Sequence, residues 1–136
     1  MANQTDDDGQ AAITKLKHDI LIQWALQPPQ MQMLRSVDVL LSTIQTVFPP
    51  ALGVPAHDYF RKWKVVTRES VLSDAGIIDE ERVKKAVRKL RFFLHPDKLP
   101  KDLNKEQEFM VKMLWDITND AWEEYEKSKA DLDWVK

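Results

Sequence analysis

The stretch from residue 79 to about residue 125 constrains this 136-residue chain most, because it predicts two amphipathic helices separated by a proline. Asp79 is a favourable N-cap residue, and two glutamates follow it where the helix dipole favours carboxylates. Apolar residues then recur at the spacing of one buried helical stripe, at Val83, Ala86, Val87, Leu90 and Leu94. Pro96 disfavours the α conformation at His95, so this helix should end at Leu94 or His95.

This predicted helix is here called the basic helix, because another of its faces carries positive charge. Its cations are Lys84, Lys85, Arg88, Lys89 and Arg91. Between residues 82 and 98 seven cations accompany one carboxylate, a local balance of +6, whereas the whole chain has a net charge of −2. Because such a face repels itself, we expect an acidic partner to bind it.

The remaining segments predict further helices and one long connector. Residues 1–9 are polar and contain three consecutive aspartates, which predicts a disordered acidic tail. Helical periodicity covers residues 10–26, which end before two prolines, and residues 31–47. Residues 49–78 form a proline-rich connector with a short helix at about residues 57–64, and the last helix covers about residues 106–129. An all-α fold built on an antiparallel helical pair follows.

The basic helix and residues 95–98 after it, here called the corner, also point to a known family. Residues 83–98, VKKAVRKLRFFLHPDK, resemble the second helix and signature loop of the J-domain, the DnaJ-type co-chaperone module. LLSTI at residues 40–44, KWK at 62–64 and NDAW at 119–122 follow the order of the auxilin J-domain. The resemblance covers about residues 37–127. It implies a helical hairpin with an extra N-terminal helix and a long packed connector before the basic helix.

This resemblance divides the chain and assigns roles to its residues. It implies an auxilin-like J-domain at residues 30–136, preceded by the predicted disordered acidic tail at residues 1–9 and by an N-terminal helix at residues 10–29 that lies outside the resemblance. It implies that the chain docks on a DnaK-class heat-shock chaperone and stimulates its ATP hydrolysis. The residues that it implies in chaperone binding are His95, Pro96, Asp97, Lys98, Lys84, Arg88, Lys89, Lys85 and Arg91.

By the same resemblance, the three residues of the corner have separate tasks and no catalytic one. Asp97 would offer a carboxylate to an arginine of the chaperone, Pro96 would fix the angle of the corner, and His95 would brace it. The client would be a clathrin coat or another protein complex, engaged through regions outside the J-domain. Because ATP and the catalytic groups belong to the partner, we expect no enzyme activity and no cofactor in this chain.

Two departures from the family pattern keep an alternative open. Val87 stands where J-domains usually have an exposed tyrosine, and Arg91 stands where they usually have a small apolar residue. Phe92 and Phe93 cannot both face the core, so one should be exposed or covered by the connector. The alternative is a J-like protein–protein interaction scaffold that no longer stimulates the chaperone.

Composition narrows the remaining function classes. The chain has no cysteine, and its three histidines show no ligand spacing, so we expect no metal site. No apolar run reaches the roughly 20 residues that span a bilayer, and the polar start is not a secretory signal, so we expect a cytoplasmic protein. Nucleic-acid binding by the basic helix is the weakest alternative, since the last helix is acidic. The five tryptophans should be core residues, with Trp63 at the rim of the basic face.

Overall fold

The structure, a computed structural model, describes residues 2–135, with side chains described for residues 9–130. Its α-helices are α1 (Ala2–Ile20), α2 (Val37–Thr43), α3 (Glu80–Leu94) and α4 (Lys105–Val135). Over residues 2–135 no strand forms, although two isolated bridges occur. The predicted all-α class is therefore confirmed.

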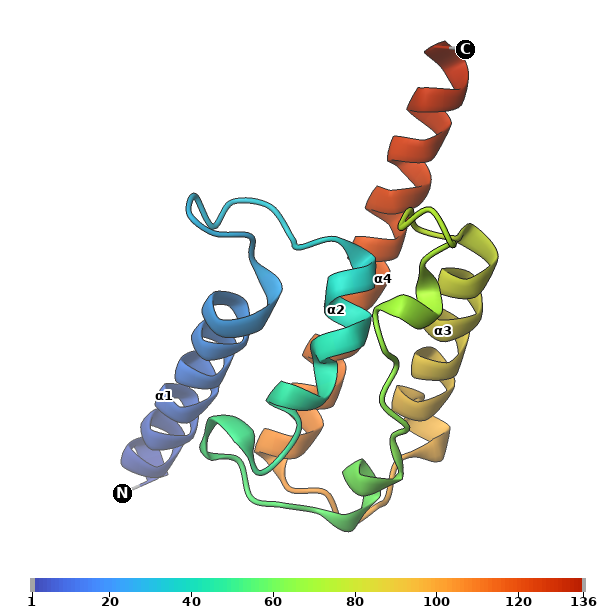
Figure 1. Cartoon of the computed structure of the whole chain (residues 1–136). Coiled ribbons are helices and arrows are strands. Elements are labelled where there is room, and N and C mark those ends of the chain that lie inside the picture. Colours follow the sequence, from blue (N-terminus) through green and yellow to red (C-terminus); the bar gives the residue numbers. More distant parts are fainter. Residues whose placement is uncertain (1, 136) are drawn as a thin grey trace.

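The long helix α4 is the centre of the arrangement. Figure 1 shows α4 running in the opposite direction to α2 and α3, and all three helices contact one another. Helix α1 contacts α4 as well. The buried side chains of these elements form one core, whose fully enclosed members include Ile20, Leu40, Leu41, Ile44, Leu90, Met110 and Leu114.

The N-terminal helix differs from its predicted bounds. It begins at Ala2 instead of near residue 10, so the tail expected to be disordered over residues 1–9 is helical from Ala2 onward. Before Pro28 this segment contains no proline, and its one glycine, Gly9, costs about 1 kcal/mol relative to alanine. The last turn widens into a π-helix, Leu21–Ala25. There the indole Nε1 of buried Trp24 donates to Thr43 Oγ1 at 3.0 Å, which fastens this turn to α2.

The second helix begins later than predicted. The periodicity placed its start at Met31, but α2 begins at Val37 and ends in a 3₁₀ turn, Ile44–Val47. Met31 has a left-handed φ of 56°, which is incompatible with an α-helix. The Arg35 amide donates to the Ala25 carbonyl at 2.8 Å, so residues 31–36 fold back along the end of the preceding helix. The predicted start is wrong because backbone groups of Met33 and Arg35 pair with residues 25–27 at the end of the preceding helix.

The connector is packed, as its apolar residues predicted. It contains 3₁₀ turns at Ala51–Gly53, Asp58–Lys62 and Glu69–Val71, of which the second confirms the short helix expected near residues 57–64. Three of its side chains, Val54, Phe60 and Val71, are buried in the core. Arg68 Nε also donates to the buried carboxylate of Asp38 in α2, at 3.1 Å. The connector therefore holds α2 and α3 together.

Candidate functional site

Helix α3 forms for the reasons that its sequence indicates. The Asp79 carboxylate accepts a hydrogen bond from the Arg82 amide at 3.1 Å and caps the helix. All five residues of the predicted apolar stripe are buried. The helix ends at Leu94, and His95 has an extended backbone with φ −62° and ψ 133°. Pro96 therefore ends the basic helix where predicted.

The corner between α3 and α4, residues 95–98, is exposed and locally braced. Its residues 96–98 form a 3₁₀ turn in which the Lys98 amide donates to the His95 carbonyl at 2.8 Å. The Asp97 amide donates to His95 Nδ1 at 3.1 Å, and the His95 ring lies edge-on to Trp115 with centroids 6.0 Å apart. The Asp97 side chain is 85% exposed. A fixed backbone therefore presents this carboxylate to solvent.

Most of the predicted cations flank the corner on α3. Lys85, Arg88 and Lys89 are exposed, and Lys84 is half-buried. In the part of the chain that the structure describes, none of these four forms an ion pair with a carboxylate. No carboxylate among the described side chains thus neutralises their charge, and this face keeps a positive potential.

Arg91 lies apart from that face. Its Nε donates to Asn119 Oδ1 of α4 at 2.6 Å, and the side chain is half-buried. The structure thus places Arg91 at the α3–α4 contact, although its sequence position suggested the basic face. Val87 is 1% exposed and belongs to the core, so α3 offers no aromatic ring at that position. Phe92 is the exposed member of the aromatic pair, at 64%.

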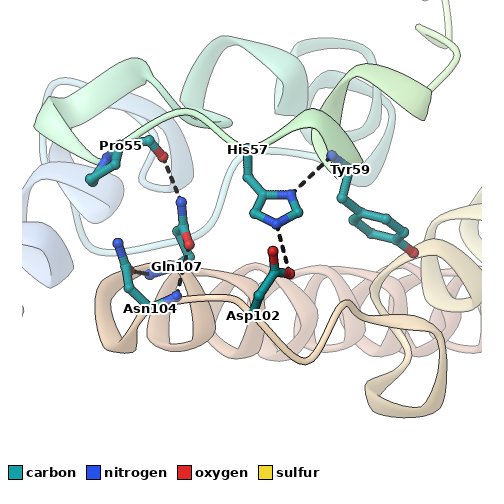
Figure 2. A network of polar contacts seen from close by, with 6 residues as sticks. All are labelled: Pro55, His57, Tyr59, Asp102, Asn104 and Gln107. Carbon is teal, nitrogen blue, oxygen red and sulfur yellow. Dashed lines mark hydrogen bonds and ion pairs between the residues drawn. The ribbon is translucent and has the colours of Figure 1, made fainter.

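The sequence did not indicate how the connector reaches the segment after the corner. Figure 2 shows His57 between the two: its Nε2 lies 3.0 Å from Asp102 Oδ1, and its Nδ1 accepts from the Tyr59 amide at 3.1 Å. An amide donor at Nδ1 requires the neutral tautomer with its hydrogen on Nε2. The hydrogen bond from His57 lowers the pKa of Asp102 below its ordinary value.

A second link between the connector and the segment after the corner, also drawn in Figure 2, involves the start of α4. The Asn104 amide donates to Gln107 Oε1 and the Gln107 amide to Asn104 Oδ1, both at 2.8 Å, which is a capping-box arrangement. Gln107 Nε2 then donates to the Pro55 carbonyl at 2.7 Å. The Asn-x-x-Gln spacing is a local signal that could have predicted the helix start. The bond to Pro55, 52 residues away, has no sequence signal.

The connector also fixes the end of α3 through aromatic residues. The Tyr59 hydroxyl donates to the Phe93 carbonyl at 2.6 Å, and the two rings stack with centroids 4.7 Å apart. Burial raises the pKa of Tyr59. Trp63 also packs against Phe93, with ring centroids 5.3 Å apart. These contacts position the last turn of α3, and hence the corner that follows it.

The tryptophans divide between core and surface. Trp24 and Trp122 are buried, whereas Trp63 and Trp115 are half-buried. Trp63 borders the side of α3 that carries Lys89, as its cationic neighbours suggested. Trp134 lies outside the residues whose side chains are described.

Comparison with protein-family models, with curated proteins and with solved structures gave no match. None of the helices described is both long and apolar enough to cross a membrane. Over the same residues, no three His, Asp or Glu side chains lie together as a metal site would require. The site is therefore interpreted from its own geometry.

Proposed function

We propose that this chain is a co-chaperone with an auxilin-like J-domain, which docks on a DnaK-class heat-shock chaperone and stimulates its ATP hydrolysis. One observation carries the proposal. An exposed carboxylate, on a corner fixed by a proline and two local hydrogen bonds, stands between antiparallel helices and beside cations that have no partner among the described residues. The residues that resemble the J-domain signature form this corner.

The proposed mechanism assigns binding and positioning to this chain and the chemistry to its partner. Asp97 pairs with a guanidinium of the chaperone in a charge-assisted contact. His95 and Pro96 hold the backbone in place beforehand, which lowers the entropy lost on binding. Lys84 and Arg88 raise the rate of encounter with an acidic surface. Stimulation requires that the corner bind the hydrolysis-competent state of the chaperone more tightly than the resting state.

Client recruitment belongs to regions outside the J-domain part. Helix α1 and its π turn lie outside the resemblance, and Ile22 in that turn is an exposed large apolar side chain. A clathrin coat or another protein complex is the proposed client class. A pull-down that compares the full chain with one starting at Gln30 tests this part separately from the ATPase reaction.

Single-turnover ATP hydrolysis by a DnaK-class chaperone tests the central proposal. The wild-type chain should accelerate hydrolysis, and Asp97→Asn should reduce the acceleration about tenfold or more, because a hydrogen bond to a charged group contributes roughly 1.5–3 kcal/mol. His95→Gln should also reduce it. Asp74→Asn, a change at an exposed carboxylate in the connector, is the matched control. Equal acceleration by all four proteins contradicts the proposal.

The basic face is tested by charge reversal and salt. Lys84→Glu combined with Arg88→Glu should slow association with the chaperone, and raising the ionic strength should weaken the wild-type complex, because exposed charges are screened. Lys101→Glu, at an exposed lysine outside α3, should leave association unchanged. A complex that is insensitive to salt would argue against docking through this face.

A second candidate function, a J-like scaffold that binds without stimulating, is favoured by two features of α3. Val87 is buried and Arg91 is bonded to Asn119, so two positions present different chemistry to a partner than J-domains usually do. Calorimetric binding of the chaperone without any acceleration of hydrolysis would support this scaffold. Acceleration by the wild-type chain would exclude it.

A further inference from the structure

A second surface, separate from the corner, lies where the connector crosses the end of α3. It is a groove of about 550 Å³, lined by residues between Tyr59 and Ser70 and by Lys89, Phe92 and Phe93 of α3. Two of the five exposed large apolar side chains among the described residues line it, Val65 at 56% and Phe92 at 64%. Exposed apolar side chains gathered in one hollow mark an interaction site more often than scattered ones do.

The floor of this groove consists of packed aromatic rings. Tyr59, Phe93 and Trp63 pack against one another with centroid separations of 4.7 Å and 5.3 Å, and the Tyr59 hydroxyl is bonded to the α3 backbone. Such a floor loses little conformational entropy when a ligand covers it. An apolar side chain placed there would be removed from water without reorganising the protein.

The rim of the groove is positive on both sides. Lys62 and Lys64 stand on the connector, Lys89 stands on α3, and no carboxylate is among the lining residues. A ligand that fits must therefore bring negative charge on both sides of an apolar group. A short linear peptide meets this requirement when carboxylates flank a large apolar side chain.

The packing of the rings argues against a nucleic acid as the occupant. Bases bind such surfaces by stacking on open aromatic faces. Here Tyr59 and Phe93 stack on each other with an interplanar angle of 13°, and Lys98 Nζ covers the Phe92 ring at 4.8 Å from its centroid. The groove thus offers a hollow for an apolar side chain and cations for carboxylates.

We infer that this groove binds a linear acidic segment of a partner protein, with an aromatic or large aliphatic side chain seated against Trp63, Phe92 and Phe93. The inference goes beyond the proposed co-chaperone function, because peptide binding does not require Asp97 or ATP. Phe92 joins the two surfaces, since it lines the groove and carries Lys98 of the corner over its ring.

Fluorescence anisotropy with a labelled peptide, Glu-Glu-Leu-Phe-Glu-Glu, tests the inference on the full chain. Binding should be saturable and should weaken about tenfold when serines replace Leu-Phe or lysines replace the glutamates, because either change removes one of the two contact types. Phe92→Ser should weaken binding of the original peptide about as much. The pair Lys62→Glu and Lys64→Glu should weaken it more.

Matched variants separate the groove from general surface effects. Ile77→Ser changes an apolar side chain that is 67% exposed and does not line the groove, and Lys101→Glu reverses a lysine elsewhere, so both should bind as the wild type does. Asp97→Asn should also bind normally, which keeps this result independent of the ATPase assay. Equal binding by all variants, or no preference for Leu-Phe over serines, would overturn the inference.

Two other occupants give distinct results in the same experiments. Tighter binding of a single-stranded decathymidine than of the peptide, with loss in Phe92→Ser, would overturn the peptide assignment in favour of a nucleic acid. Concentration-dependent dimerisation by sedimentation equilibrium, with loss in Phe92→Ser, would overturn it in favour of a second copy of the chain.

Discussion

The corner at residues 95–98 and the connector at residues 49–78 are held in opposite ways. Hydrogen bonds in the corner join residues two or three positions apart, such as the Asp97 amide to His95 Nδ1. Bonds from the connector reach 34 residues from Tyr59 to Phe93 and 52 residues from Gln107 to Pro55. The corner also lies in solvent, whereas the connector places several side chains in the core.

Because of this difference, we expect the corner to contribute mainly to partner binding and the buried part of the connector to contribute mainly to stability. A corner with local bonds and exposed side chains can change its chemistry at little cost to folding. A connector with long-range bonds and buried rings cannot, because each contact joins two or more elements. We therefore expect substitutions at the buried or long-range bonded residues of the connector to change the free energy of unfolding, and substitutions in the corner to change partner binding.

The largest expected effect is at Phe60. This side chain is buried and packs on Phe48 with ring centroids 5.4 Å apart, so Phe60→Ala should lower the free energy of unfolding by about 3–5 kcal/mol. Urea unfolding followed by circular dichroism measures it. Phe92→Ala, at an exposed ring, is the control and should change stability by less than about 0.5 kcal/mol. Similar small losses in both variants would show that the connector does not stabilise the fold.

Substitution of Gln107 should have the second-largest effect on the free energy of unfolding. Gln107→Ala removes the acceptor of the Asn104 amide and the donor to the Pro55 carbonyl, at a cost of about 1–3 kcal/mol, because each intramolecular hydrogen bond contributes about 0.5–1.5 kcal/mol. Asn104→Ala removes only the acceptor of the Gln107 amide and keeps the bond to Pro55, so its loss should be smaller, about 1 kcal/mol. Thermal unfolding compares the two variants. Equal losses would show that the bond to Pro55 contributes little beyond the cap.

Asp79 gives a further test of the comparison. Its N-cap bond is as local as the bonds of the corner, but we expect it to contribute to stability. Asp79→Ala removes the N-cap bond to the Arg82 amide and should cost about 1 kcal/mol. Asp74→Ala, at an exposed aspartate in the preceding turn, is the matched control. Urea unfolding should separate the two, and an equal effect would mean that the cap contributes little.

The smallest expected effect is a pH dependence at Asp102. Its pKa is lowered in the folded chain by the hydrogen bond from His57, so this contact stabilises the fold above the unfolded pKa. The stabilisation should be lost as pH falls below the ordinary carboxyl pKa of about 3.9 and through the lower folded pKa. Asp102→Asn should therefore show a shallower loss of stability over that range than the wild type. Parallel curves for the two proteins would show that the contact does not contribute.

Local patterns predicted α3, the corner and most of α4. The cap at Asp79, the apolar stripe and Pro96 act within a few residues, and the structure has each of them in place. The cap pair Asn104 and Gln107 was equally local and equally readable. The sequence predicted that Phe92 and Phe93 do not both face the core, but it did not indicate that Phe92 is the exposed one.

Contacts between distant segments account for what the sequence did not predict. The late start of α2 depends on Arg35 pairing with Ala25, and Arg91 turns toward Asn119, which is 28 residues away. His57 and Asp102 are 45 residues apart and carry no shared pattern. Side-chain partners of this kind depend on how elements pack, so periodicity alone could not assign them.

The π turn at Leu21–Ala25 absorbs one residue of chain length without changing which side of the helix faces the core. Its hydrogen bonds close one residue later than those of an α turn, so its five residues advance about as far around the axis as four α-helical residues at about 100° each. Deleting an exposed residue of this turn should therefore restore ordinary winding, keep α1 against α4 and keep the bond from Trp24 to Thr43. The wide turn thus makes this end of the helix tolerant of a one-residue change in length.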